Sequence, residues 1–339
     1  MIIRRLTILA VAAGLIATTL ATPASATGTT TDLGVSLSLG LYTGDLAVAG
    51  GKVFVSAGDR IVVTDAQGDP AGSITGLSSV YGLAASADGA SVYAALAGSN
   101  QVAEIDTATL DVERRIDLPG HPCPTSLALT GERLWVGYGC FDEFQGGFLA
   151  LDLTAASPAP VAVGLGLHSA PKVVAAGGTL VAGAVTGVPA DLIVYDISGP
   201  TPTWRGTIDG VTHDQSEVKD LALTSDGARV ISAFDTPHKY DAWDTTTLSL
   251  VRRYGQRHEA FPTGVAISPD DAYVAGGHDW NYGVSVYDAA TGAAVFSADN
   301  PAGTFVTGGI AFSGTDLYAL LRGDGDQLYL WRIKDVVQP

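Results

Sequence analysis

Short apolar and alternating segments, separated by turn residues, recur along most of this chain. In residues 81–124, apolar runs occupy 82–85 and 91–96, and alternating segments occupy 101–106 and 112–118. The turn residues Asp88-Gly89 and Gly98-Ser99-Asn100 interrupt them. Alternation with a period of two indicates half-buried strands. Four short strands in roughly 40 residues are typical of one blade of a β-propeller.

The same pattern occurs seven times, with spacings of 37 to 48 residues between copies. The first strands of the copies align at 45–48, 82–85, 126–129, 172–175, 220–223, 264–267 and 309–312. The third aligned position is Ala in six of the seven copies, as expected where inner strands crowd around an axis. The sequence therefore predicts an all-β fold over 27–335, a seven-bladed β-propeller with four-stranded blades.

The two ends of the chain contain an incomplete copy and an unassigned strand. The seventh copy stops after its third strand at 327–334, whereas the alternating segment 32–39 precedes the first copy. We expect this N-terminal strand to complete the last blade, which closes the ring and removes an exposed edge. Residues 336–339 then form a tail or a linker.

Aspartate ends the third strand in six copies. Such recurring carboxylates resemble catalytic or calcium-binding groups, but an Asp at a strand end also accepts hydrogen bonds from the following turn. Recurrence in nearly every copy favours the structural interpretation. The six residues are Asp65, Asp106, Asp152, Asp196, Asp244 and Asp288.

The N-terminus and the charge indicate export. Arg4 and Arg5, the apolar stretch 6–20 and the small residues Ala24-Ser25-Ala26 are typical of a secretory signal peptide over 1–26, cleaved after Ala26. Removing this segment changes the net charge from −17 to −19. Such acidity disfavours nucleic acid and anionic membranes as partners. We expect a secreted, monomeric protein without a membrane span.

Two copies carry a more specific resemblance. In the second copy, Ser86-Ala87-Asp88-Gly89 precedes Val92-Tyr93, and Asn100-Gln101-Val102 precedes Ile105-Asp106-Thr107-Ala108-Thr109. The sixth copy repeats this order with Ser268-Pro269-Asp270, Tyr273-Val274 and 286–292. The pattern resembles the YVTN-type β-propeller repeat of secreted bacterial proteins, especially actinobacterial ones. This resemblance implies the fold and export, and it transfers no catalytic residue.

Cys123 and Cys140 are the two cysteines, and both lie in the third copy. In an oxidising compartment they are expected to form a disulfide. Their places before the first strand and at the end of the second put both at one face of the ring. The bridge would hold the loop 141–147.

Histidines dominate the candidate chemistry. By the alignment, all six fall in loops of that same face, either before first strands or between second and third strands. Neutral imidazole binds metals and titrates near neutral pH. However, no pair has metal-ligand spacing. We therefore assign candidate binding residues without a metal or cofactor: His121, His168, His213, His238, His258 and His278.

Other candidates lie around the same loops. Trp280 and Tyr282 beside Asp279 are suited to stacking on a sugar ring or to contacting a protein, and Phe261 adds apolar area. Lys172 and Asp220 precede the apolar anchors of their strands, so they line the mouth of the channel or pair with each other.

Two functions remain open from the sequence. The first is a secreted or cell-surface scaffold that binds an extracellular protein or glycan through the face with the histidines. The alternative is an exported enzyme, either a lactonase-like hydrolase or a metal-dependent enzyme, that uses histidines at the channel mouth. Catalytic residues are not assigned.

Overall fold

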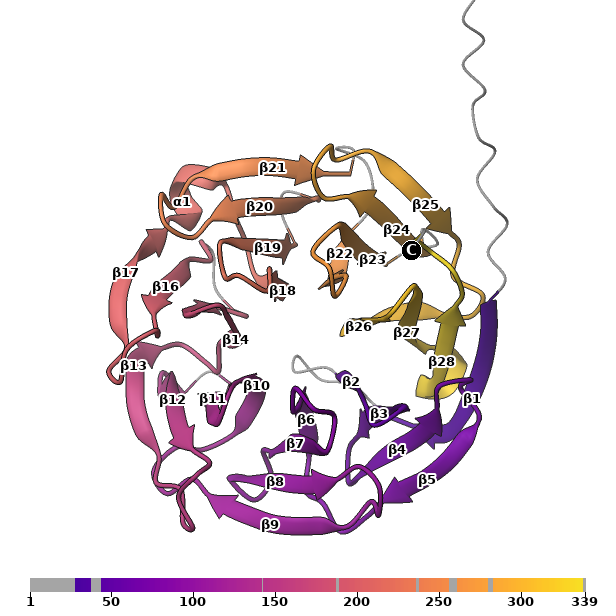
Figure 1. Ribbon diagram of the computed structural model, residues 1–339, viewed down its shortest axis with the longest axis horizontal. Helices are drawn as coiled ribbons and strands as arrows, with labels where there is room; N and C mark the ends of the chain where they lie inside the picture. The colour runs from indigo at the N-terminus through magenta and orange to yellow at the C-terminus, as the bar shows by residue number, and fades with distance from the viewer. Residues whose placement is uncertain are drawn as a thin grey trace, which may run out of the picture.

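A ring of seven antiparallel sheets forms the molecule in the computed structural model (Figure 1). The structure describes residues 28–37, 44–141, 143–186, 189–235, 238–255, 261–279 and 283–337. The expected signal peptide 1–26 lies outside these residues. Each sheet has four strands, and the first strand of each blade lies nearest the axis (Figure 1). The predicted seven-bladed β-propeller is confirmed.

The blades follow the seven sequence copies in order. Blade 1 contains β2 (Leu46–Ala49), β3 (Lys52–Ala57), β4 (Arg60–Asp65) and β5 (Pro70–Ile74). Blade 2 contains β6 (Val80–Ala85), β7 (Ser91–Leu96), β8 (Gln101–Asp106) and β9 (Val112–Asp117). Blade 3 contains β10 (Pro124–Thr130), β11 (Arg133–Tyr138), β12 (Gly146–Asp152) and β13 (Val161–Leu167). Blade 4 contains β14 (Lys172–Ala176), β15 (Thr179–Gly183), β16 (Leu192–Asp196) and β17 (Thr203–Ile208).

The remaining blades complete the ring. Blade 5 contains β18 (Val218–Leu223), β19 (Arg229–Phe234), β20 (Tyr240–Asp244) and β21 (Leu250–Tyr254). Blade 6 contains β22 (Pro262–Ile267), β23 (Tyr273–His278), β24 (Gly283–Asp288) and β25 (Ala294–Ala298). Blade 7 contains β26 (Thr304–Ser313), β27 (Asp316–Arg322), β28 (Gln327–Ile333) and β1 (Gly28–Ser36). A short helix α1 (Gly210–His213) precedes blade 5, and a 3₁₀ turn η1 (Asp324–Asp326) precedes β28.

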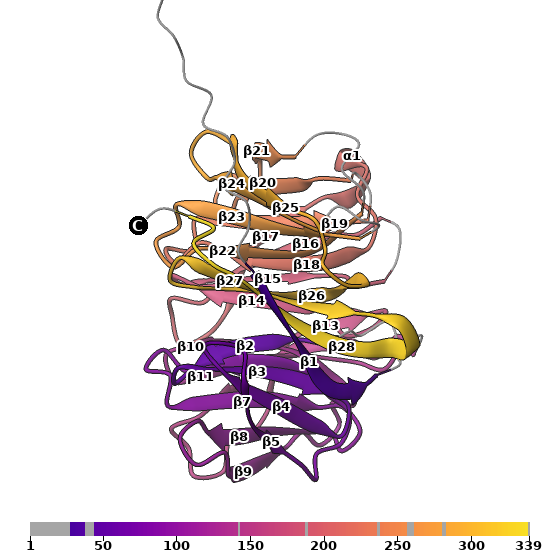
Figure 2. The same cartoon turned by 90° about the vertical axis from the view of Figure 1, so that its right-hand side faces the viewer.

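Blade 7 is built from both ends of the chain, as expected. β1 pairs antiparallel with β28, in a register that runs from Gly28 opposite Ile333 to Asp32 opposite Tyr329. Figure 2 shows β1 running beside β28 at the edge of the ring. The N-terminal strand thus covers the edge that β28 would otherwise expose.

The core is divided into seven apolar clusters, one between each pair of neighbouring blades. Aromatic residues of the second strands are buried in these clusters, with Phe54 and Trp135 at 0% exposure. Both faces of every blade are therefore buried against a neighbour. This explains why short strands with nearly continuous apolar residues are stable here.

The aspartates that end the third strands accept hydrogen bonds from the turns that follow them. Asp106 Oδ1 accepts the N–H groups of Ala108 and Thr109, and Asp244 Oδ1 accepts those of Thr246 and Thr247. Asp65, Asp152, Asp196 and Asp288 bond their own turns in the same way. These bonds hold the pKa of Asp106 and Asp244 below the usual range. The predicted structural role is confirmed.

Within the part of the chain that the structure describes, no helix is long and apolar enough to cross a membrane.

Closure by β1 can be tested at Leu33, which is 9% exposed and packs in the cluster between blades 7 and 1. We predict that Leu33→Ala lowers the free energy of unfolding by about 2–5 kcal/mol, the range for truncating a buried leucine. Chemical denaturation measures this. The control is Val161→Ala on an outer strand, where the side chain is 61% exposed. Equal, small effects of both variants would contradict a closing role for β1.

Candidate functional site

The loops gather at the two ends of the ring. Because neighbouring strands in a blade are antiparallel, loops before first strands and between second and third strands lie at one end. We call this end the histidine face, and the opposite end the pocket face. His121, His168, His213, His238 and His278 all belong to the histidine face, as do Phe261 and Asp279. His258, Trp280 and Tyr282 lie outside the described residues.

The described histidines come from loops and strand ends of several blades. Each packs edge-on against an aromatic ring near its own blade. The ring-centre distances are 4.7 Å for His121–Tyr138, 4.1 Å for His168–Phe144, 4.7 Å for His213–Trp243, 4.6 Å for His238–Phe261 and 5.5 Å for His278–Tyr240. Among the described residues, the structure places no group of three or more His, Cys, Asp or Glu that could hold a metal ion.

Two histidines differ from their expected loop positions. His278 is the last residue of β23 rather than a loop residue, and it is 2% exposed, so it belongs to the core between blades 5 and 6. His213 ends the short helix α1, which the sequence pattern did not predict. Asp279, which follows His278, donates its backbone N–H to the carbonyl of Phe261 at 3.1 Å. This bond holds two candidate residues side by side on the histidine face.

The cysteines of blade 3 are joined, as expected. Cys123 and Cys140 form a disulfide with Cα atoms 5.0 Å apart. The Cys123 N–H also donates to Asn100 Oδ1 of blade 2 at 3.0 Å. At Gly139, φ is +132° and an added Cβ would lie 2.4 Å from Gly146 Cα. The base of the loop is therefore both bridged and closely packed.

Above this base, the loop presents two exposed phenylalanines. Phe141 is 45% exposed and Phe144 is 68% exposed. The His168 ring contacts both, at 4.1 Å from Phe144 and 6.4 Å from Phe141, and its carbonyl accepts the Phe144 N–H at 3.2 Å. We call Phe141, Phe144 and His168 the Phe–His cluster. The sequence pattern indicated the loop and His168 as parts of this face, but the two phenylalanines were not predicted as binding residues.

Lys172 and Asp220 pair with each other at the axis. Lys172 Nζ lies 3.0 Å from Asp220 Oδ1, and an added Cβ at Gly308 of blade 7 would lie 3.0 Å from the same Nζ. Burial lowers the pKa of Lys172, but the charges of Asp220 and Asp45 outweigh this and raise it to about 12. Burial raises the pKa of Asp45, and Lys172 partly offsets the rise. The lysine side chain extends from blade 4 across the channel.

Side chains at this axial position also connect neighbouring blades. Asp45 Oδ2 accepts the Leu83 N–H of blade 2 at 2.9 Å, and Asp220 Oδ2 accepts the Val265 N–H of blade 6 at 2.9 Å. Ser126 Oγ accepts the Val173 N–H of blade 4 at 3.0 Å. In each case a side chain of blade 1, 3 or 5 accepts a backbone N–H group of the blade that follows it. These polar side chains hold neighbouring blades together, which gives the polar residues at the channel mouth a structural role.

A second buried carboxylate lies in blade 5. The Asp241 side chain is 0% exposed, and its Oδ1 is 3.1 Å from Arg253 Nε. Burial raises the pKa of Asp241 to about 6, although Arg253 and Lys239 oppose the rise. Such a pKa suits a general acid or base. However, the side chain is closed off from solvent and so from any substrate.

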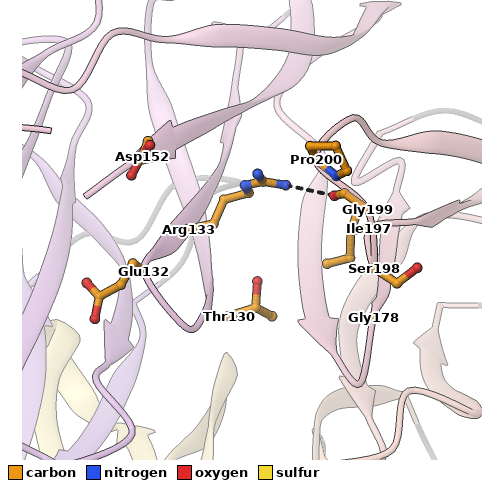
Figure 3. Close-up of a pocket in the computed structure, with 9 residues that line it drawn as sticks. All are labelled: Thr130, Glu132, Arg133, Asp152, Gly178, Ile197, Ser198, Gly199 and Pro200. Carbon is orange, nitrogen blue, oxygen red and sulfur yellow. Dashed lines mark hydrogen bonds between the residues drawn. The ribbon is translucent and has the colours of Figure 1, made fainter. Parts of the chain in front are cut away.

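A pocket of roughly 530 Å³ opens on the pocket face, between blades 3 and 4. It lies between the 130–133 turn and Asp152 of blade 3, and Gly178 and the 197–200 loop of blade 4 (Figure 3). Arg133 occupies its centre and donates from Nη1 to the Gly199 carbonyl at 3.4 Å (Figure 3). This pocket was not predicted from the sequence. The sequence signal for it is a cationic residue at the first position of the second strand. Arg133 stands there in the third copy and Lys52 in the first.

Comparison with known proteins supports the architecture. No protein-family model matches the chain, and no curated protein matches it. A chain in the crystal structure of a mitotic checkpoint complex is similar with a TM-score of 0.72 and 16% identity, covering 98% of this chain and 99% of that one. The Myceliophteria thermophila Cps50 (Swd1) β-propeller domain is similar with a TM-score of 0.64 and 17% identity, covering 86% and 96%. At these identities, the likeness shows the propeller fold.

The disulfide is expected to stabilise the histidine face. Its cysteines are 17 residues apart, and cross-linking a loop of this length stabilises a protein by about 3 kcal/mol in the chain-entropy model. We predict that replacing both Cys123 and Cys140 with Ser lowers the free energy of unfolding by about that amount. It should also speed proteolysis within 141–147. Reductant should destabilise the native protein and leave the double variant unchanged. A reductant-insensitive native protein would contradict the prediction.

The axial cluster predicts a pH-dependent variant. Without Lys172, burial raises the pKa of Asp45 further, so the folded state loses stability as pH rises above the carboxylate's unfolded value of 3.8. We predict that Lys172→Met costs roughly 3 kcal/mol near neutral pH and clearly less near pH 4.5. Denaturant unfolding at both pH values measures this. Adding Asp220→Asn should recover part of the loss at neutral pH, whereas a pH-independent loss would refute the prediction.

Proposed function

We propose that the protein is an exported binding scaffold that contacts a protein partner through the Phe–His cluster on its histidine face. The single observation that carries this proposal is the pair Phe141 and Phe144, exposed at 45% and 68% on a loop closed by a disulfide. Exposed aromatic residues on a structured loop are characteristic of interaction sites.

The exposed apolar area of the loop and its rigidity both favour binding of a partner. Fully burying an exposed phenylalanine is worth about 1.5–3 kcal/mol. Phe141 and Phe144 have 45% and 68% of their surface still exposed, so each would contribute a corresponding share of the binding free energy. The disulfide and the bond from Phe144 N–H to the His168 carbonyl order the loop in advance. Less conformational entropy is then lost on binding.

The remaining chain supports an extracellular protein partner. The 1–26 segment and the disulfide both favour export. The net charge of −17 favours a partner that is neutral or basic around the contact. The hydrolase or metal-enzyme alternative has no specific observation in its favour among the described residues, so one function is proposed.

The test compares two variants of the mature protein. One replaces Phe141 and Phe144 with Ala. The control is Trp204→Ala, which removes an aromatic residue that is 61% exposed on the outer strand β17. Each protein is immobilised and exposed to secreted and cell-surface proteins of the producing organism and, separately, to a glycan array. Bound proteins are identified by mass spectrometry, and their affinities are then measured with purified material.

We predict a defined protein partner whose affinity falls at least tenfold, or about 1.4 kcal/mol, in the double Phe variant and is unchanged by Trp204→Ala. Equal binding by all three proteins would refute the Phe–His cluster as the site. Binding to glycans without a protein partner would refute the proposed partner class.

A further inference from the structure

The pocket between blades 3 and 4 carries chemistry that the proposed function does not use. It lies at the opposite end of the ring from the Phe–His cluster, and a single arginine lies at its centre (Figure 3). Its volume of roughly 530 Å³ falls within the range of small-molecule sites.

The Arg133 side chain lies over the ring of Trp135, which restricts its movement. Its guanidinium carbon lies 5.6 Å from the centre of the Trp135 ring. Trp135 is itself fully buried, and its Nε1–H donates to Thr130 Oγ1 at 2.9 Å. A guanidinium over an immobile indole loses little freedom when it binds a ligand. Thr130 Oγ1 uses a lone pair for the indole, so its own O–H can still donate to a ligand.

Most of the Arg133 donors remain available. Among the described residues, no carboxylate lies within ion-pair distance of this guanidinium, and its hydrogen bond to Gly199 uses Nη1 alone. Lys52 stands at the equivalent position of blade 1 and bridges to the Thr107 carbonyl of blade 2 at 2.9 Å. The Lys52 bond is shorter than the 3.4 Å bond from Arg133 to Gly199, and it shows that a single hydrogen bond from this position links two blades. The other donors of Arg133 are therefore not needed for the blade contact. The remaining fork of Arg133 matches a carboxylate bidentately.

Two acids flank the arginine without pairing with it. Figure 3 shows Asp152 and Glu132 on different sides of the Arg133 side chain. The side-chain and backbone donors of Thr154 hold the pKa of Asp152 below its usual range, and the charge of Arg133 adds to this, so the carboxylate is ionised at neutral pH. Counted as formal charges, Arg133, Asp152 and Glu132 sum to −1. A simple anion would be repelled, and a simple cation would leave the guanidinium unmatched.

We propose that this interblade pocket binds a small zwitterion of the α-amino-acid class. The ligand carboxylate lies on the guanidinium of Arg133 and accepts the Thr130 hydroxyl. Its ammonium group lies toward Asp152, while Glu132 adds to the negative potential of the site. Ile197 and Pro200 offer apolar contact to the ligand side chain. This inference is independent of the proposed function, because it uses other residues at the other end of the ring.

Titration calorimetry with leucine, acetate and butylamine tests the ligand class on the mature protein. Leucine has both charges, and each of the other two has one. We predict saturable leucine binding below about 10 mM, and at least tenfold weaker binding of acetate and of butylamine. Absence of leucine binding at that concentration, or acetate binding as tight as leucine binding, would overturn the proposal.

Variants assign the binding to the pocket. Arg133→Lys keeps the charge but loses the fork, so leucine affinity should fall at least tenfold. Lys52→Met removes the equivalent bridge between blades 1 and 2 and should leave leucine affinity unchanged. Glu132→Gln should lower the ratio of leucine affinity to acetate affinity, because it weakens the negative potential of the site. Unchanged leucine binding in Arg133→Lys would refute the assignment. Partner binding through the Phe–His cluster should persist in every one of these variants.

Discussion

Every blade of this ring has two apolar faces, and neither can be buried by the blade alone. The seven apolar clusters therefore lie between blades, and each draws its residues from two neighbours. A row of such blades would leave one apolar face exposed at each end. Packing of blade 7 against blade 1 buries both of these faces, and the pairing of β1 with β28 completes blade 7 so that this packing can form. The positions of the loops at both ends of the ring depend on this closure.

Features set by residues near each other in sequence could be predicted. The turn aspartates bond groups two to four residues away, so each copy carries its own evidence for them. The strand order follows from the repeat, and the incomplete seventh copy indicated the place of β1. The disulfide also connects residues of one copy, and the alignment brought both to the same end of a blade.

Features that depend on contacts between blades could not be predicted in the same way. His278 resembled a loop residue, but it is buried beside Tyr240 of the preceding blade. Sequence spacing left Lys172 and Asp220 free to face solvent or each other, because it says nothing of reach across a channel. Arg133 was not predicted as a binding residue because one wall of its pocket is the 197–200 loop of the next blade. The tertiary fold decides such pairings, and the local pattern does not specify them.

The axial hydrogen bonds have a mechanical consequence. Asp45, Ser126 and Asp220 couple blades 1 with 2, 3 with 4, and 5 with 6, and Lys172 adds a link between 4 and 5. In blade 7 the aligned position is Gly309, which has no side chain to offer the same link. Blade 7 is also the one assembled from both chain ends. Glycine also occupies this position in blades 2 and 6, as Gly82 and Gly264. Under tension, the joints 2–3, 6–7 and 7–1 would therefore separate before the four linked ones, and two of these three flank the blade assembled from both chain ends.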